Sequence, residues 1–367
     1  MIKQRAIVIG GGIHGITIAL ALADTNVSVT LIERNNKLLQ GTSAATHNRA
    51  HVGYHYPRSI STAAECIRGF EYFKLNYPKA LYYPKETYYA IAKEGSKTSA
   101  SDYIKFCDRM QIPYRIDWPP SKFLSREHVD ICLLVPEPCF NLGVLYQLLK
   151  KELVQKKVKV KTSSNIIGAK WENNETYTAL IKNNNTEEQI TADIMINATY
   201  TYSNNILNVC GLGLDRTEYY YHTTEVVVAR SRKLHIPALT IMDGPFISVV
   251  PNSGYEDLYL VYDVMHSVVH EERGFLYEEP EKLQSNWRKM IGHGVKYFPF
   301  LEALEFVKSL WGSRPVPVDD TVDSRHTRVV AHKASKGFYS IMEGKFISAP
   351  LIAQELVGMI RKDGLLK

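Results

Sequence analysis

The sequence predicts an α/β fold in which a domain built on a parallel sheet is interleaved with a β-rich α+β domain. Three observations lead to this prediction. Residues 5–33 follow the pattern strand, glycine turn, helix, strand. Residues 217–265 are rich in Val, Ile, Thr and Tyr with turn signals between the runs, which indicates several antiparallel strands. Residues 338–361 return to strand, turn and helix, so we expect the end of the chain to fold back onto its beginning.

The first 33 residues carry a glycine pattern typical of dinucleotide-binding sites. An apolar run is followed by Gly10-x-Gly12-x-x-Gly15 and a helical stretch, and a second apolar run ends in Glu33. Gly10 permits a tight turn, Gly12 lets the backbone approach a pyrophosphate, and Gly15 lets the helix pack on the strand. The helix N-terminus attracts phosphates, and the Glu33 carboxylate is placed to accept hydrogen bonds from ribose hydroxyls.

This segment therefore predicts a Rossmann-type domain that binds an ADP-containing dinucleotide. The residues expected to contact the dinucleotide here are Gly10, Gly12, Ile13, His14, Gly15, Glu33 and Arg34.

The apolar stretch 6–23 is too interrupted to be a signal peptide or a membrane span. Four glycines and a histidine break it, and Asp24 closes it early. No other stretch is long and apolar enough to span a bilayer. We therefore expect no transmembrane segment, while a peripheral contact with a membrane stays open.

The composition is that of an ordinary globular protein of 367 residues, 45% hydrophobic and 22% charged, with a net charge of +6. We assign this charge to solvated surface lysines, with attraction of an anionic substrate or an acidic membrane surface as the alternative. No basic run is interleaved with aromatic residues, which argues against nucleic acid as a partner. Five scattered cysteines without a C-x-x-C pair predict a reducing, cytoplasmic location.

Hydrophobic periodicity predicts the remaining elements in chain order. Helices are expected at 60–76, 101–110, 141–153, 280–291, 301–310 and 349–361. Strands are expected at 88–92, 158–162, 177–181, 190–197 and 338–342, and a loop is expected at 312–320.

Four short segments resemble one superfamily of flavoenzymes. They are Gly-Thr-Ser at 41–43, His-x-Gly-x-x-Tyr at 51–56, Asp-Ile-Met-Ile-Asn-Ala at 193–198 and Gly-Ser-Arg-Pro at 312–315. With the glycine pattern, they resemble the FAD-dependent superfamily of D-amino-acid oxidase, glycine oxidase, L-2-hydroxyglutarate dehydrogenase and glycerol-3-phosphate dehydrogenase. The resemblance covers the N-terminal part well, the middle thinly and the C-terminal part in outline.

The resemblance implies a D-amino-acid-oxidase-like fold with FAD as the cofactor. A flavin stays bound through both half-reactions and must be held along its whole length, which a second loop such as 42–53 can do. We expect an FAD-binding domain from residues 1–85, 141–215 and 310–367, and a substrate domain from residues 86–140 and 216–309.

Two turns are expected to hold FAD in addition to the glycine pattern. Thr42 and Ser43 lie where the superfamily's flavin loop faces the pyrophosphate. Gly344 and Lys345 lie in a turn that approaches the pyrimidine edge of the flavin in the superfamily, with a solvated loop lysine as the alternative for Lys345. This turn lacks the usual double glycine, and Tyr200 stands where the superfamily has glycine. Both departures concern the substrate class more than the fold.

Two residues are predicted to act on the substrate. Arg314 is expected to hold an anionic group in a two-bond fork, unless it pairs structurally with Asp319 or Asp320. His51 is expected to take a proton from a hydroxyl or ammonium group as a neutral imidazole, unless it is structural. His266 is the alternative base from the β-rich part.

No metal site is expected. His47, His51 and His55 are spaced four apart, as metal ligands on one helix face are. Gly53 and Pro57 make a continuous helix unfavourable there, and no carboxylate or cysteine joins the group. A covalent link from His47 or His51 to the flavin stays open.

The predicted function is that of an FAD-dependent oxidoreductase. It oxidises a C–H bond at a hydroxyl- or amine-bearing carbon of a small anionic substrate by hydride transfer to flavin N5, and oxygen or a quinone-type acceptor reoxidises it. The substrate is of the 2-hydroxy acid or amino acid type. The alternatives are an amine or amino-acid oxidase that forms imine and hydrogen peroxide, and a catalytically silent flavin-binding pathway protein.

Overall fold

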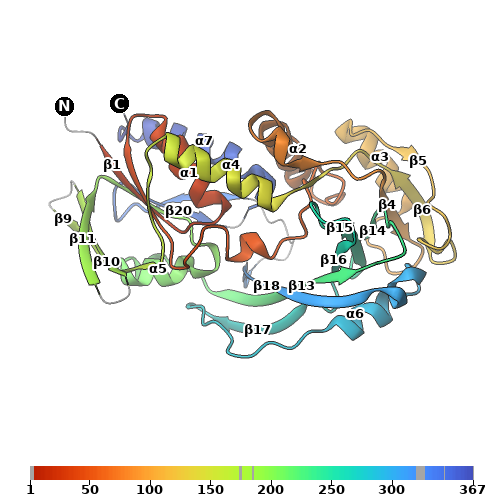
Figure 1. The fold of residues 1–367 in the computed structure, drawn as a ribbon. Helices are drawn as coiled ribbons and strands as arrows, with labels where there is room; N and C mark the ends of the chain where they lie inside the picture. Colours follow the sequence, from red (N-terminus) through yellow and green to blue (C-terminus); the bar gives the residue numbers. More distant parts are fainter. Residues whose placement is uncertain (1–3, 173–175, 184–185, 320–326, 343, 367) are drawn as a thin grey trace.

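The structure is a computed structural model. It describes residues 4–172, 176–183, 186–319, 327–342 and 344–366. Most of its strands form two large sheets, which lie at opposite ends of the molecule in Figure 1. The chain termini lie near each other, at the end that holds β1 (Arg5–Ile9).

The six-stranded sheet holds the glycine turn. Its order is β19-β20-β12-β1-β2-β8, and all neighbours are parallel except β19 with β20. Besides β1, its strands are β2 (Ser28–Ile32), β8 (Lys159–Lys161), β12 (Ile194–Asn197), β19 (Arg328–Ala331) and β20 (Phe338–Met342). Because β20 pairs with β12 beside β1, the end of the chain folds back onto its beginning, as the sequence predicts.

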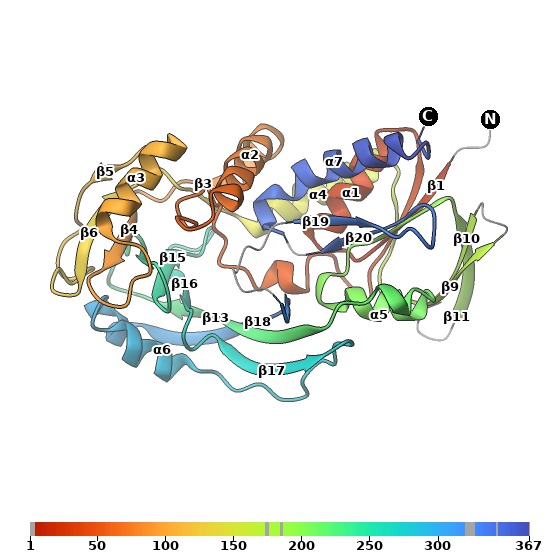
Figure 2. The ribbon, with the colours of Figure 1, turned by 180° about the vertical axis from the view of Figure 1, so that it is seen from behind.

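Helices cover one face of this sheet, and a small antiparallel sheet covers the other (Figures 1 and 2). The helices are α1 (Ile13–Ala23), α4 (Leu142–Gln155) and α7 (Ala349–Lys362). The small sheet consists of β9 (Ser164–Glu172), β10 (Thr176–Asn183) and β11 (Thr186–Ala192), next to α5 (Ser203–Val209). Alternation along β1 places Ala6 and Val8 in the helix-side core and Ile7 and Ile9 in the other.

The second large sheet has nine strands and is mainly antiparallel. The path is β17-β13-β16-β15-β14-β4-β6-β5, with β18 on the other side of β13. Its strands are β4 (Thr87–Ala92), β5 (Arg115–Ile116), β6 (Val129–Leu134), β13 (Tyr219–Arg230), β14 (Ala238–Met242), β15 (Ile247–Pro251), β16 (Leu258–Asp263), β17 (Val268–Gly274) and β18 (Glu305–Pro317). β14 and β4 are its parallel pair.

Each face of the second sheet packs against a helix. Tyr88 of β4 lies in the core that includes α6 (Trp287–Gly294), and Tyr89 lies in the core that includes α3 (Ala100–Met110). The long helix α2 (Ile60–Asn76) follows residues 42–56, which we call the histidine-rich loop because they contain His47, His51 and His55. A two-stranded sheet joins β3 (Leu81–Tyr82) to β7 (Cys139–Phe140).

Strands β13 and β18 connect the two ends of the molecule. They pair from Tyr219 with Pro317 to Arg230 with Glu305. In Figures 1 and 2 the pair runs from the α6 end toward the six-stranded sheet. This places the C-terminal end of β18 next to the dinucleotide side of the fold.

The helix expected at 301–310 and most of the loop expected at 312–320 are wrong. A short 3-10 helix at Pro299–Ala303 is followed by β18, which pairs with β13 along its whole length. Its prolines, Pro315 and Pro317, are tolerated because an edge strand does not need every N–H. Residue 320 lies outside the described residues.

Two other elements differ in extent. The strand expected at 190–197 is divided at Asp193 into β11 and β12, which belong to different sheets. There Asp193 exchanges hydrogen bonds with the backbone of Arg5. The helix expected at 280–291 begins at Trp287.

We propose that the two large sheets mark two domains, one from residues 1–85, 141–215 and 310–367 and the other from residues 86–140 and 216–309. All strands of the six-stranded sheet come from the first set, and β18 crosses the boundary. Within the described ranges, no helix is long and apolar enough to cross a lipid bilayer.

Candidate active site

Backbone contacts close the glycine turn after β1 so tightly that no side chain would fit. Gly10 has a φ of +103°, and a Cβ added there would lie 2.6 Å from the carbonyl oxygen of Ala198. A Cβ at Gly15 would lie 1.8 Å from the carbonyl oxygen of Gly10. The N-terminus of α1 is therefore held against the end of β1, where folds of this type bind a pyrophosphate.

The loop that follows β2 lies on the N-terminus of α1. The Ser43 hydroxyl accepts a hydrogen bond from the N–H of Ile13 at 3.1 Å, and a Cβ at Gly12 would lie 3.2 Å from the same hydroxyl. The Thr42 hydroxyl donates to the carbonyl oxygen of Ser313 at 2.9 Å, which ties this loop to β18. The structure thus brings the two predicted phosphate-facing segments together.

Glu33 is buried at the end of β2. Its carboxylate oxygens accept hydrogen bonds from the N–H groups of Gly11 and Asn35, both at 2.7 Å. These bonds hold the carboxylate on the glycine turn and leave lone pairs for ribose hydroxyls. The guanidinium of Arg34 stacks 3.9 Å from the centre of the Tyr202 ring, so it lies beside the turn and against an aromatic surface.

The C-terminal turn meets the start of α1. Gly344 has a φ of +119°, and a Cβ there would lie 3.0 Å from His14 Nε2 and 2.7 Å from Thr327 Oγ1. The hydroxyls of Thr327 and Ser348 donate to the buried Glu65 carboxylate at 2.7 and 3.0 Å. Burial lowers the pKa of His14 to about 4, partly opposed by the Glu65 charge, so this imidazole is neutral at pH 7.

A buried cation lies in the middle of the histidine-rich loop. The Arg49 side chain donates to the Tyr89 hydroxyl at 2.9 Å and to Glu137 Oε2 at 3.5 Å. It also donates to His47 Nδ1 at 3.2 Å, and His47 Nε2 in turn donates to the carbonyl oxygen of Leu260 at 2.9 Å. Burial and then the Arg49 charge lower the pKa of His47. The neutral imidazole satisfies both of these bonds.

His51 lies beside the same network. Its Nδ1 is 3.9 Å from Glu137 Oε1, which also accepts the Val52 N–H at 3.0 Å. Burial lowers the pKa of His51 well below its usual value, and the positive charges of the neighbouring groups, Arg49 and Lys345 among them, lower it further. His51 is therefore an uncharged imidazole at neutral pH.

Lys345 connects the C-terminal turn with the loop of His51. The side chain is 8% exposed, so the alternative of a solvated loop lysine is wrong. Its Nζ lies 4.5 Å from the centre of the Tyr56 ring, and its charge contributes to the lowered pKa of His51. The structure thus brings Lys345 and His51 into one electrostatic environment.

Arg314 lies on β18, one residue after the contact with the flavin loop. Its Nε is buried and has no hydrogen-bond partner among the described residues. Within the described ranges it forms no ion pair with Asp319, and Asp320 lies outside them. No described contact joins Arg314 to His51. Their link is indirect, through Ser313 and the loop that leads to His51.

Tyr200 takes the backbone conformation that its position requires. Its φ is +54°, in the left-handed region that favours glycine. The Asn197 side chain fixes this turn, because it accepts from the N–H and hydroxyl of Thr199 and donates to the carbonyl oxygen of Ser203. The turn after β12 therefore has a left-handed residue at the position where the superfamily has glycine.

The remaining sequence candidate, His266, is separate from this region. It lies next to Asp263 at the end of β16 and next to His293 of α6, and no contact between described residues links it to His51. His266 therefore does not lie beside the proposed dinucleotide site.

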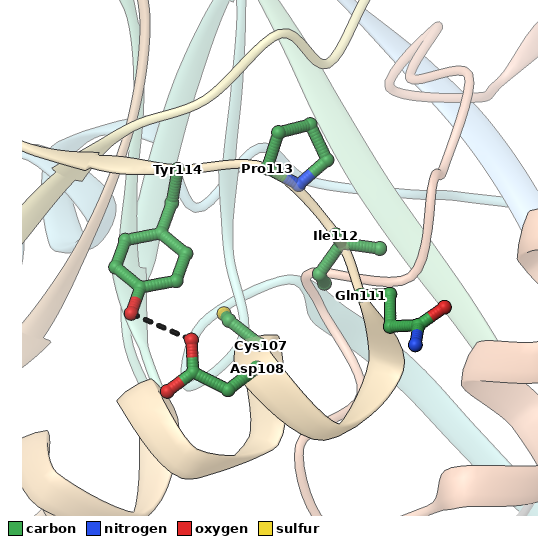
Figure 3. A pocket seen from close by; sticks show the side chains of 6 residues that line it. All are labelled: Cys107, Asp108, Gln111, Ile112, Pro113 and Tyr114. Atoms are coloured by element: carbon green, nitrogen blue, oxygen red, sulfur yellow. Dashed lines mark hydrogen bonds between the residues drawn. The ribbon is translucent and has the colours of Figure 1, made fainter.

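A hollow of about 360 Å³ lies at the end of α3 (Figure 3). It is lined by Cys107, Asp108, Gln111, Ile112, Pro113 and Tyr114. The Tyr114 hydroxyl donates to Asp108 at 2.8 Å, and burial raises the pKa of Cys107 to about 12. A thiol with such a pKa is no nucleophile at neutral pH, and no residue predicted to bind flavin or substrate lines this hollow.

Sequence reasoning missed the network of Arg49, Tyr89 and Glu137. Arg49 lies between two histidines that were singled out, but an arginine in a loop ordinarily faces water. Glu137 lies between two prolines in a loop-rich stretch, which gives no sign of burial. The pairing arises when the fold brings β4 and the loop after β6 beside the histidine-rich loop.

The arrangement of these residues fits FAD. The glycine turn, Ser43 and Glu33 surround the N-terminus of α1, where the ADP part would be held. His14 Nδ1 is buried without a hydrogen-bond partner among the described residues, beside the turn of Gly344. A long cofactor that passes from the ADP site toward Lys345 would meet these polar groups in turn.

Solved structures share the fold along almost the whole chain. Glycine oxidase from Geobacillus kaustophilus superposes with a TM-score of 0.75 at 13% identity, over 98% of this chain and 95% of that one. L-proline dehydrogenase from P. horikoshii gives 0.73 at 18% identity, over 99% and 94%. L-alpha-glycerophosphate oxidase from Mycoplasma pneumoniae, solved with FAD bound, gives 0.73 at 18% identity, over 98% and 95%. The predicted D-amino-acid-oxidase-like fold is confirmed.

Curated relatives match over shorter stretches. FAD-dependent monooxygenase FPY4 from Fusarium mangiferae is 28% identical over 130 residues, which are 35% of this chain and 35% of the relative. FAD-dependent monooxygenase kojA from Aspergillus flavus is 31% identical over 103 residues, 27% of this chain and 24% of the relative. The matched region thus spans about a third or a quarter of these relatives.

The family comparison covers nearly the whole chain. The family described as FAD dependent oxidoreductase matches residues 5–359, the range that contains the glycine turn, the histidine-rich loop, β18 and the C-terminal turn. FAD is therefore the cofactor, and the chain belongs to the FAD dependent oxidoreductase family.

Proposed function

We propose that the protein oxidises a C–H bond at a carbon bearing a hydroxyl or amine in a small anionic substrate, of the 2-hydroxy acid or amino acid type. The observation that carries this proposal is the environment of His51. A neutral imidazole lies beside two buried cations, Arg49 and Lys345, on the loop whose Ser43 contacts the dinucleotide turn. A base that is uncharged at pH 7 can accept a proton from the substrate, and the neighbouring positive charges attract an anionic substrate.

FAD, when bound, supplies the chemistry of accepting the hydride from the oxidised carbon. The protein must then remove a proton from the hydroxyl or ammonium group, and we assign this to His51. Glu137 lies on the Nδ1 side of the ring at 3.9 Å, which favours a proton on Nδ1 and leaves the Nε2 lone pair as the base. Positioning supplies most of the rate, since substrate and base must be held in reactive geometry.

We assign the anionic group of the substrate to Arg314. Its buried Nε has no partner among the described residues, and leaving a buried charged donor unsatisfied is costly. A substrate carboxylate would satisfy it with two parallel hydrogen bonds, which a lysine cannot form.

The first experiment is an absorption spectrum of the purified protein, before and after acid precipitation. We expect bands near about 375 and 450 nm and release of free FAD into the supernatant. Colour that stays with the pellet would indicate a covalent link to His47 or His51. Anaerobic addition of 2-hydroxy acids and amino acids should then bleach the long-wavelength band for one class of substrate.

The outcome of that screen separates the candidate functions. Bleaching by a 2-hydroxy acid or an amino acid supports the proposal, and peroxide formation in air distinguishes oxygen from a quinone-type acceptor. A flavin that no small hydroxy or amino acid bleaches would contradict the proposal and favour a catalytically silent flavin protein. The side chain of Tyr200 at a turn where the superfamily has glycine is the feature that favours this second candidate.

A further inference from the structure

A carboxylate and two imidazoles meet between the end of β16 and helix α6, apart from the proposed active site. Asp263 ends β16, His266 follows in the next turn, and His293 lies in the last turn of α6. His293 Nδ1 lies 2.6 Å from Asp263 Oδ2, and His266 Nδ1 lies 3.5 Å from Asp263 Oδ1. One potential ligand atom from each residue lies within 4.8 Å of the others.

The backbone holds the Asp263 carboxylate in place. Its side chain has 0% exposure, and Oδ1 accepts the N–H groups of Met265 and His266 at 2.8 and 3.2 Å. This leaves Oδ2 turned toward His293. In the part of the chain that the structure describes, the ion-pair partners of Asp263 are these two imidazoles, so no lysine or arginine balances the buried charge.

The nitrogen of His266 that faces this carboxylate, Nδ1, is buried and forms no hydrogen bond with the described residues. The main chain around it is fixed, since the Asn286 side chain at the start of α6 donates to the carbonyl oxygen of His266 at 3.0 Å. A cation would stabilise a buried carboxylate that faces an unpartnered imidazole nitrogen.

We propose that Asp263, His266 and His293 bind one divalent transition-metal ion of the Zn²⁺ type. Two imidazole nitrogens and one carboxylate oxygen are typical ligands of such an ion. Tetrahedral bonds to Zn²⁺ separate the ligand atoms by about 3.3 Å. The contact of 2.6 Å between His293 Nδ1 and Asp263 Oδ2 has to open by about 0.7 Å. The contact of 3.5 Å from His266 Nδ1 is with the other oxygen, Oδ1, so side-chain rotations have to bring both imidazoles toward one carboxylate oxygen.

The fourth position would be taken by water. The side chains of His266 and His293 are 25% and 14% exposed, so solvent reaches the imidazole side of the site. The ion would link the end of β16 to the last turn of α6. It is a structural brace within the β-rich part of the molecule, and the inference does not depend on the proposed function.

The test is a titration of the tag-free, chelator-treated holoprotein with Co²⁺, followed by displacement with Zn²⁺. Tetrahedral Co²⁺ gives visible bands at longer wavelength than the flavin, so the readout does not require activity. We expect one Co²⁺ per chain. His266→Ala and His293→Ala should each weaken its binding about tenfold or more, the range in which disturbed metal sites lose affinity.

His270→Ala is the matched control, because its imidazole lies on neighbouring β17, is 38% exposed and faces Glu272 at 3.7 Å. It should bind Co²⁺ like the unaltered protein. No bound Co²⁺ in the unaltered protein, or equal losses in all three variants, would overturn the proposal and leave a plain histidine–aspartate hydrogen bond. If His293→Ala does not fold, the more exposed His266→Ala decides, with far-UV circular dichroism as the check on folding.

Discussion

At the scale of single residues, the site depends on imidazoles that are kept neutral. His51 has a pKa lowered by burial first and by nearby positive charges second. A general base must be deprotonated at the working pH, and ordinary histidines are partly protonated just below neutrality. The Arg49 and Lys345 charges thus make His51 a base that stays competent in mildly acidic solution, although they also weaken its basicity.

The first prediction is that His51→Asn keeps FAD and loses turnover. We expect kcat to fall by about 10²–10⁴-fold, the typical contribution of a positioned base, with an unchanged flavin spectrum. In the unaltered protein kcat/KM should stay level as the pH falls through 6.5, since the pKa of His51 is lowered, and it should decline only at more acidic pH. A variant that retains normal kcat would remove His51 from the mechanism.

The second prediction concerns Arg314→Lys. Lysine keeps the positive charge but cannot reproduce the two-bond fork, so we expect KM for an anionic substrate to rise about tenfold or more, in line with the roughly 1.5–3 kcal/mol of a hydrogen bond to a charged group. FAD content should not change. Lys308→Arg on the same strand, at an exposed position, is the control. Retained KM and kcat would exclude Arg314 from substrate binding.

The third prediction is that Arg49→Leu destabilises the protein strongly. Glu137 is 2% exposed, and removal of Arg49 would leave this buried carboxylate without its counter-charge, although Tyr89 and Val52 still donate hydrogen bonds to it. We expect a loss of about 3–5 kcal/mol in the free energy of unfolding, measured by urea denaturation. Arg115→Leu, which breaks an exposed pair with Asp117, should change stability by less than about 1 kcal/mol. Similar losses in both variants would contradict this account.

At the scale of secondary-structure elements, the close contact of α1 with β1 organises the dinucleotide turn. The fourth prediction compares two glycines in helices. Gly15→Ala would place a Cβ 1.8 Å from the carbonyl oxygen of Gly10, so we expect α1 to shift and FAD binding to be lost. Gly358→Ala in α7 meets nothing within 4 Å and should raise stability by about 0.5–1 kcal/mol. Fluorescence titration with FAD and urea denaturation measure both effects, and normal FAD binding by Gly15→Ala would contradict the first.

Local patterns made α1, α2 and α7 predictable. α1 directly follows the glycine pattern, and the apolar spacing of α2 and α7 lies within each helix. The same reasoning failed for β18, because Leu301, Leu304, Val307 and Leu310 are spaced as on one face of a helix and two prolines suggest a loop. This segment forms a strand because it pairs with β13, and some of the paired residues are 90 positions apart in the sequence. Such a partner is invisible to a window of neighbouring residues.

The candidate site also has a part that could be predicted from the sequence and a part that could not. The glycine turn with Glu33 could be predicted because its chemistry is contained in one continuous segment. The environment of His51 could not, since Glu137, Tyr89 and Lys345 come from three distant segments. Burial turns a charge that would be solvated at a loop surface into one that sets the pKa of its neighbours.

At the scale of the whole molecule, several partly buried imidazoles couple stability to pH. The pKa values of His14, His47 and His51 are all lowered on folding, chiefly by burial. Below pH 6.5 the unfolded chain therefore binds protons that the folded chain does not. Stability contributed by the neutral imidazoles is present above this pH and is lost as the pH falls. Glu137 and Glu152, whose pKa values are raised by burial, act in the opposite direction.

The fifth prediction is that the free energy of unfolding falls between pH 7.5 and 5.5, measured by urea denaturation with saturating FAD at each pH. Below its unfolded pKa, each neutral imidazole contributes a slope of up to about 1.4 kcal/mol per pH unit. His47→Gln should make the curve shallower by about the amount of one such group, with the exposed His270→Gln as the control variant. Both variants keep every carboxylate, so the difference between their pH dependences reports the contribution of the His47 imidazole. A pH dependence that is the same in both would mean that His47 is protonated in the folded protein, which would conflict with the hydrogen bond that its Nδ1 accepts from Arg49.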